Sequence, residues 1–83
     1  MHKSQPIEDS VQVEASLTDG KVNPQTVTWQ GRQYQVIGIG RQWQEANGTH
    51  VLIELHDQSR MEVCMGANLS WQLCRYWPAA TLA

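Results

Sequence analysis

The sequence predicts an all-β fold: a single small antiparallel meander of five to six strands, as a curved sheet or small barrel, with essentially no helix. Apolar and polar residues alternate through short segments rich in Val, Thr, Trp and Tyr, and turn residues separate these segments. No segment shows a sustained 3.6-residue period. Eighty-three residues suffice for one domain. We place it at residues 10–78, between a polar segment 1–9 that we expect to be mobile and a short tail 79–83.

The first predicted strand runs from Val11 to Leu17, where apolar residues occupy alternate positions. Asp19-Gly20 is the turn that ends it. Residues 21–24 are expected to be a connection, because Pro24 has no N–H to donate to a ladder and restricts the residue before it.

Residues 25–36 form the clearest hairpin of the chain and the expected nucleus of the fold. Gly31 stands where the chain must reverse and supplies the positive φ of a tight turn. A two-residue loop there pairs Trp29 with Arg32. This register also keeps the apolar residues of both strands on one face.

The alternation changes phase just after this hairpin. We interpret Gly38 and Gly40 as a β-bulge that shifts the strand by one residue. For the next reversal, the hydrophobic pattern favours a three-residue loop, Ala46-Asn47-Gly48, which pairs Trp43 with Val51.

The later strands keep their apolar residues at odd positions, in 51–55, 61–65 and 69–73. Turn residues at 57–59 and 66–68 separate them, and Trp77-Pro78 ends the last strand.

Composition and motifs argue against several classes of function. A formal net charge of −2 gives no electrostatic footprint for nucleic acid or an anionic membrane. The N-terminus lacks the apolar run of a signal peptide and no segment is long enough to span a bilayer, so we expect a cytoplasmic protein. No spacing assigns roles to a nucleophile and a base, and Gly38-Ile39-Gly40 continues neither with a third glycine nor with a helix. We therefore expect no enzyme activity and no cofactor.

Cys64 and Cys74 are predicted to be free thiols. If Met65 pairs with Leu69, Cys74 lies four residues along the strand from the partner of Cys64, about 13 Å away. Disulfides need Cα atoms within about 7 Å of each other.

A metal site is a further, weaker hypothesis. Even positions of two neighbouring strands carry side chains of the kinds that bind metals: His50, Glu54, His56, Glu62 and Cys64. No close ligand spacing accompanies them. A solvated outer face, with His56 opposite Glu62, explains them more simply, so we expect no metal.

Three Arg–aromatic neighbourhoods provide candidate surface residues: Trp29, Arg32, Arg41, Trp43, Arg75 and Trp77. On a small barrel such groups can bind single-stranded nucleic acid by stacking and phosphate contacts. Packing of arginine stems over tryptophan rings explains them equally, and the acidic balance opposes phosphate binding.

The leading hypothesis is a non-enzymatic binding or structural module whose partner is another protein or a second copy of itself. A thin β domain leaves apolar surface or a strand edge for another chain. Nucleic-acid binding is the alternative, and a metal-binding or hydrolytic domain is the second alternative.

The chain resembles an uncharacterised family of small bacterial β domains. The resemblance covers about residues 27–77 and rests on the run Val27-x-Trp29-x-Gly31-Arg32-x-Tyr34-x-Val36, then Trp43, an apolar hairpin and Trp71-x-Leu73-x-Arg75. It implies a bacterial β-meander of unknown function, with no catalytic residues to carry over.

Overall fold

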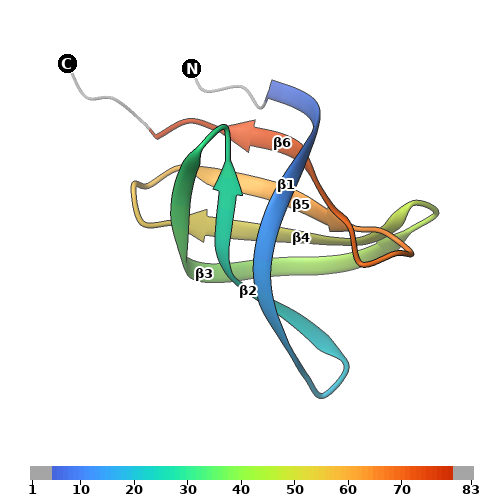
Figure 1. The fold of residues 1–83 in the computed structure, drawn as a ribbon. Coiled ribbons are helices and arrows are strands. Elements are labelled where there is room, and N and C mark those ends of the chain that lie inside the picture. Colours follow the sequence, from blue (N-terminus) through green and yellow to red (C-terminus); the bar gives the residue numbers. More distant parts are fainter. Residues whose placement is uncertain (1–4, 80–83) are drawn as a thin grey trace.

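Six antiparallel strands close into a small barrel in a computed structural model that describes residues 5–79 (Figure 1). The strands follow one another around the barrel in chain order, and β1 also pairs with β6 to close the ring. Their bounds are β1 Gln5–Thr18, β2 Lys21–Trp29, β3 Arg32–Glu45, β4 Gly48–Leu55, β5 Arg60–Met65 and β6 Trp71–Trp77. The predicted all-β meander is confirmed, and the described residues contain no helix.

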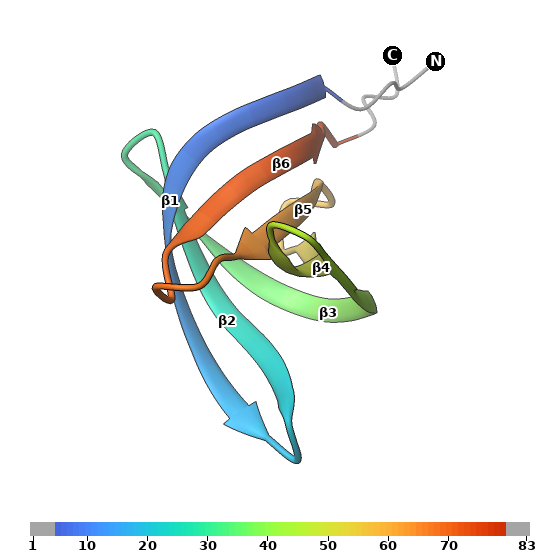
Figure 2. The same ribbon diagram turned by 90° about the vertical axis from the view of Figure 1, so that its right-hand side faces the viewer.

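The first strand is longer than its sequence pattern indicates. β1 begins at Gln5 instead of Val11, and its first part pairs with β6 while its second part pairs with β2 (Figure 2). Residues 5–9 of the segment expected to be mobile thus belong to a strand, since main-chain pairing does not require apolar side chains. Residues 1–4 of that segment, and 80–83 of the predicted tail, lie outside the described residues.

The expected connection at residues 21–24 is instead the start of β2. Pro24 is buried and lies opposite Ala15, next to a shift in the β1–β2 register between Glu14 and Ala15. A bulge is one of the few places where a sheet accepts proline, because the ladder is already interrupted there.

The β2–β3 hairpin has the predicted register, with Trp29 opposite Arg32 and Val27 opposite Tyr34. Its two turn residues both have positive φ, 52° at Gln30 and 76° at Gly31. Such a turn matches the right-handed twist of the strands that it joins.

The bulged β3 strand is confirmed, but the predicted loop after it is wrong. The register shifts twice, between Val36 and Gly38 and between Ile39 and Gln42. The turn is the two-residue Ala46-Asn47, so Trp43 lies opposite His50 and not Val51. The second shift changes the phase again, which the alternation alone could not reveal.

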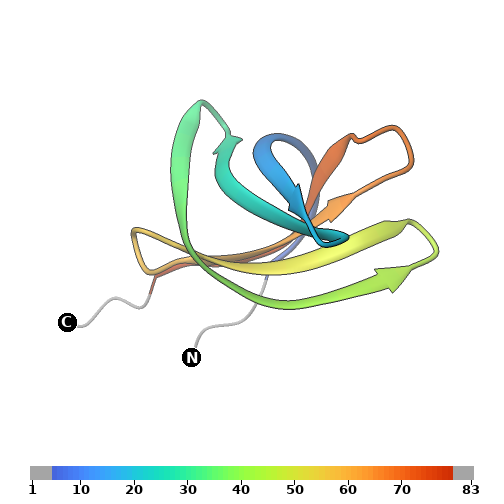
Figure 3. The same cartoon turned by 90° about the horizontal axis from the view of Figure 1, so that it is seen from below.

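Gly48, expected to be the third residue of the loop, is instead the first residue of β4 and lies opposite Glu45. Its φ is 139°, and a Cβ at this position would lie 2.2 Å from the main-chain oxygen of Met65. Glycine is therefore needed at position 48 because the β3–β4 turn lies very close to the end of β5, and not because of the conformation of the turn. The β3–β4 and β5–β6 turns lie side by side at one end of the barrel (Figure 3).

The last hairpin also differs from its predicted register. Met65 pairs with Trp71, two residues further along than the predicted Leu69, and Leu69 is a loop residue that is 70% exposed. The ladder then shifts: Val63 pairs with Leu73 but Glu62 pairs with Arg75, which leaves Cys74 as an extra residue in β6.

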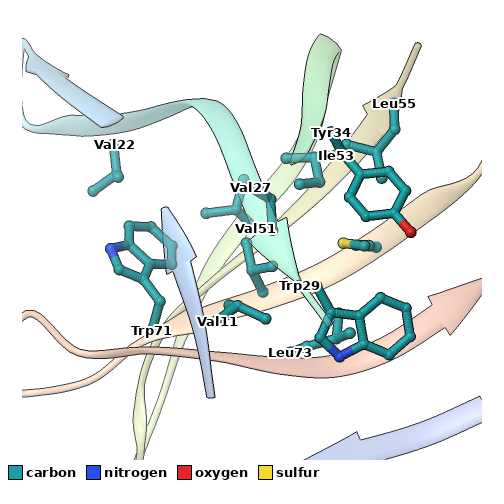
Figure 4. Close-up of a cluster of buried hydrophobic side chains, with 12 residues drawn as sticks. Val11, Val22, Val27, Trp29, Tyr34, Val51, Ile53, Leu55, Trp71 and Leu73 are labelled. Atoms are coloured by element: carbon teal, nitrogen blue, oxygen red, sulfur yellow. The ribbon is translucent and has the colours of Figure 1, made fainter. Parts of the chain in front are cut away.

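The core fills the barrel with the odd-position residues of the later strands, as predicted (Figure 4). The fully buried side chains include Val27, Val51, Ile53, Leu55, Met61, Val63 and Leu73. The odd phase fails in the bulged part of β3, where Ile37 is 65% and Ile39 44% exposed.

Candidate functional sites on the outer surface

A cluster of donor atoms lies on the outer surface of three adjacent strands, at the end of the barrel that carries the β3–β4 turn. His50 of β4, Cys64 of β5 and Cys74 of β6 each provide one nitrogen or sulfur atom, and these atoms all lie within 4.8 Å of one another. We call these residues the thiol–imidazole cluster. His50 and Cys64 are only 4% and 3% exposed, which is unusual for side chains that point away from a barrel core.

Polar contacts hold the imidazole of His50 on both sides. Its Nδ1 is 2.8 Å from Oε2 of Glu62, and its Nε2 is 2.8 Å from Oδ1 of Asn47 in the β3–β4 turn. Glu62 also lies 3.7 Å from the guanidinium of Arg75, and the Cys64 thiol donates to the Asn47 main-chain oxygen at 3.7 Å. Acidic and amide oxygens thus surround a histidine that little solvent reaches.

The thiols of the cluster are protonated at neutral pH. The pKa of the Cys74 thiol is raised to about 11, mainly by burial and to a smaller extent by the neighbouring Cys64 and Glu62. Burial is also the main reason that the pKa of Cys64 lies above its usual value. An anionic thiolate is costly in a buried position beside carboxylates unless a cation accompanies it.

Trp43 covers the cluster from the β3 side. Its ring stacks on His50, with centroids 5.3 Å apart and planes 19° apart, and the Arg41 guanidinium lies 5.2 Å from its centroid. Its indole N–H donates to Glu45 at 2.6 Å. The two-residue turn brings this about, because it places Trp43 opposite His50.

The prediction of two free thiols is confirmed for Cys64 and Cys74, but the separation on which it rested is wrong. In the actual register Cys64 lies opposite Gln72, and the extra residue in β6 brings Cys74 to the same neighbourhood. Sequence reasoning therefore missed Cys74 as a member of the cluster. A break in the alternation of β6 could have indicated the extra residue, because apolar residues stand at positions 71 and 73 and then at 76.

Two other members of the predicted ligand set, Glu54 and His56, lie elsewhere. His56 sits in the β4–β5 turn, where its Nδ1 accepts a hydrogen bond from the main-chain N–H of Gln35. The expected pairing of His56 with Glu62 is wrong, since Glu62 lies opposite Leu52 and contacts His50. Glu54 is exposed further along β4.

The predicted aromatic surface residues do not gather on one face. Trp29 is only 9% exposed, donates its indole N–H to Asp9 and packs against Tyr76. Its partner Arg32 lies over Tyr34 instead. Trp43 belongs to the cover of the thiol–imidazole cluster.

The remaining pair, Arg75 and Trp77, also separates. Arg75 contacts Glu62 beside the thiol–imidazole cluster. Trp77 lines two hollows at the end of β6. The described arrangement therefore offers no continuous row of stacking platforms.

A second surface feature, which we call the outer groove, lies beside the end of β4 and the start of β5. It consists of two hollows of about 330 and 310 Å³ that share Glu54, Arg60 and Trp77 as lining residues. Gly40 and Leu52 line the first and Ile37 the second. A Cβ at Gly40 would meet Leu52 at 3.6 Å, so the missing side chain leaves this part of β4 uncovered.

Comparisons with known proteins identify no relative: no family model, curated protein or solved structure matches this chain. No helix among residues 5–79 is long and apolar enough to cross a membrane.

Proposed function

We propose that this chain is a non-enzymatic protein-interaction module whose outer groove docks a second copy of the same chain. The observation that carries the proposal is the coincidence, on one face, of a hollow, exposed apolar side chains and one charge of each sign. Ile37 of β3 lines the second hollow and is 65% exposed, although most large apolar residues of the barrel are buried. The partly exposed Leu52 and Trp77 line the groove as well. Exposed apolar groups that gather beside a hollow are typical of a contact surface.

The charges favour a second copy as the occupant. Glu54 and Arg60 are exposed, lie opposite each other on β4 and β5, and line both hollows. In a two-fold dimer the same patch of both copies forms the interface. Glu54 of one copy can then contact Arg60 of the other, and the two-fold axis repeats this contact in reverse. A patch with one carboxylate and one guanidinium is complementary to itself in a two-fold dimer. A partner with a strong net charge would find no excess of the opposite charge on this patch.

A dimer interface of standard size would take a modest share of the exposed surface of this chain. A standard interface buries about 800 Å² on each partner. The chain exposes 5761 Å², so this contact would take roughly one seventh of its surface.

Single-stranded nucleic acid is the weaker alternative. Trp29 is buried, and Trp43 stacks on His50 with the Arg41 guanidinium 5.2 Å from its ring centroid, so both rings are already engaged within the chain and less suited to stacking on bases. The net charge of −2 opposes phosphate binding as well.

The test is the oligomeric state of the full chain, measured by light scattering after size exclusion and by sedimentation equilibrium from about 5 to 500 µM. We expect a monomer–dimer equilibrium that Ile37→Glu shifts at least tenfold toward monomer. Leu17→Glu is the matched control, because Leu17 is 71% exposed but lies near the β1–β2 turn and not at the groove. This control should dimerise like the wild type.

A charge-reversal series tests the partner contacts themselves. Glu54→Arg and Arg60→Glu should each weaken association, and the double variant should restore it, because the opposite signs again face each other across the two-fold axis. A strict monomer at the highest concentration would refute the proposal, as would equal effects of Ile37→Glu and Leu17→Glu. Circular dichroism of each variant separates lost association from lost folding.

A further inference from the structure

The thiol–imidazole cluster combines three donor atoms that the fold brings together from positions 50, 64 and 74, at spacings that match no metal-binding motif. It lies at the opposite end of β4 from the outer groove, with His50 and Glu54 four residues, or about 13 Å, apart along the strand. None of the three donor residues lines the outer groove, whose nearest lining residue on β4 is Leu52, two residues from His50. The proposed dimer contact uses none of these side chains.

We propose that His50, Cys64 and Cys74 bind a zinc ion through one imidazole nitrogen and two thiolate sulfurs. Nitrogen and sulfur donors select zinc over magnesium or calcium, which prefer oxygen. In four-coordinate zinc sites the Zn–S distance is about 2.3 Å and the Zn–N distance about 2.0 Å, which places neighbouring donors roughly 3.5 Å apart. The donor atoms lie within 4.8 Å of one another. Side-chain rotations that move the donor atoms by about 1 Å would therefore bring all three within bonding distance of one ion.

The surroundings of His50 suit a ligand of this kind. Histidine ligands usually hold their second ring nitrogen against a carboxylate or carbonyl oxygen, which fixes the orientation of the ring. Here both nitrogens have such an oxygen at 2.8 Å, Glu62 on one side and Asn47 on the other. Whichever nitrogen binds the ion, the other keeps its partner. The oxygen that is released remains next to the site and can occupy the fourth position.

The charges of the loaded site balance. Binding exchanges the two thiol protons for one Zn²⁺, so two protons leave to solvent and the bis-thiolate zinc unit is neutral. No oxidant or reductant takes part. Two carboxylates remain beside the site: Glu62, with Arg75 3.7 Å from it, and Glu45, whose Oε1 lies 3.9 Å from Nε2 of His50. Burial of the cluster, which is costly for a thiolate alone, strengthens the attraction between thiolate and cation.

Titration of the reduced full chain with Zn²⁺ tests the proposal, by calorimetry after treatment with reductant and chelator. A thiol assay first establishes that both cysteines are reduced. Co²⁺ in place of Zn²⁺ provides a second measurement, because cobalt bound to thiolates in a tetrahedral site absorbs strongly in the near ultraviolet and in the visible range. We expect one ion per chain, with both thiolate and tetrahedral bands.

Variants then assign the ligands. Cys74→Ser is the first choice, since Cys74 is only partly buried and the change is small; it should weaken binding at least about 100-fold and reduce the thiolate band. Glu62→Gln should weaken binding about 10–100-fold while the thiolate band persists, as expected of a residue that positions the imidazole. His56→Gln is the matched control. It changes a histidine outside the cluster and should leave the affinity unchanged.

The proposal fails if the reduced wild-type chain binds neither ion at 100 µM. It also fails if Cys74→Ser binds as tightly as the wild type, or if His56→Gln abolishes binding. A disulfide between Cys64 and Cys74 that survives reductant in the folded chain would likewise overturn it, because the donors would then be consumed.

Discussion

Gly48 offers the sharpest test of how the two turns at one end of the barrel fit together. In Gly48→Ala the new Cβ would stand 2.2 Å from the main-chain oxygen of Met65 and 2.9 Å from its carbon. Both atoms belong to the backbone, so no side chain can rotate away. Either the β3–β4 turn or the end of β5 must move, and the hydrogen bonds between β4 and β5 weaken with it.

The magnitude follows from two separate costs. Holding alanine at a φ of 139° costs about 1–3 kcal/mol, because residues with a Cβ rarely adopt this conformation. Displacing well-packed neighbours to admit one carbon adds about 1–3 kcal/mol. We expect a loss of about 4 kcal/mol. A domain of this size has a free energy of unfolding of only about 4–12 kcal/mol, so Gly48→Ala should leave little stability.

Gly31→Ala is the matched control. Gly31 also has a positive φ, 76°, but a Cβ there would meet nothing within 4 Å. Only the conformational cost remains, about 1–2 kcal/mol for an alanine in the left-handed region. Comparison of the two variants therefore isolates the steric part of the effect.

The assay is equilibrium unfolding in urea, followed by tryptophan fluorescence and by circular dichroism. With a slope near 1 kcal/mol per molar urea, typical of small domains, Gly48→Ala should lower the midpoint at least about 2 M more than Gly31→Ala does. A Gly48→Ala chain that is unfolded without urea, beside a folded Gly31→Ala chain, also meets the expectation. Equal losses in the two variants would falsify the close approach of the two turns.

Two further predictions concern the core and a turn. Leu73→Ala should cost about 2–5 kcal/mol in urea unfolding, because Leu73 is fully buried, whereas Leu69→Ala should change stability by less than about 0.5 kcal/mol, because Leu69 is exposed in a loop; similar losses would contradict the register of β6. In the β4–β5 turn, burial alone would raise the pKa of the Asp57 carboxyl, but hydrogen bonds from the hydroxyl and main-chain N–H of Ser59 outweigh it and hold this pKa below its usual value. A lowered pKa in the folded state means that the carboxylate stabilises the fold above the ordinary aspartate range and that this stability is lost as the pH falls through the lowered pKa. Unfolding midpoints measured from pH 7 to pH 2 should therefore drop less steeply in Asp57→Asn than in the wild type, and identical slopes would count against the interaction.

The sequence predicted those parts of the fold that local chemistry determines. The β2–β3 hairpin has its expected register because Gly31 and the flanking apolar residues specify the same pairing. The odd-position core of the later strands was equally clear, since alternation is a direct consequence of one buried face.

The other features of the fold depend on register shifts and on pairing between distant strands. The alternation of apolar and polar residues does not show where these occur. The first register shift in β3 exchanges the buried and exposed faces of the strand, and the second shift exchanges them back. As a result Trp43 lies on the outer surface and not in the core, where a single shift would put it. The start of β1 at Gln5 is supported by pairing with β6 and not by an apolar pattern. Both features are determined by pairing between strands that lie far apart in the sequence. An error of one residue in such a register exchanges the two faces of a strand.

The candidate sites were only partly predictable for the same reason. His50, Cys64 and Glu62 were recognised as neighbours on an outer face, but Cys74 was placed far from them. The outer groove had no signal in the sequence beyond Gly38 and Gly40, whose interpretation as a β-bulge does not predict a hollow. In the structure the absent side chain at Gly40 also leaves the surface of Leu52 open.

The extra residue in β6 links the architecture of the barrel to its surface chemistry. Because Cys74 is inserted between Leu73 and Arg75 in the ladder, the strand turns its face over, and Tyr76 packs against Trp29 with ring centroids 5.0 Å apart. A serine at position 74 would remove a sulfur and keep this geometry. Deletion of residue 74 would instead reverse the orientation of every later side chain in β6 and withdraw Tyr76 from its partner. Position 74 can therefore lose its sulfur by substitution, whereas its deletion would require the pairing between the first and last strands to be rebuilt.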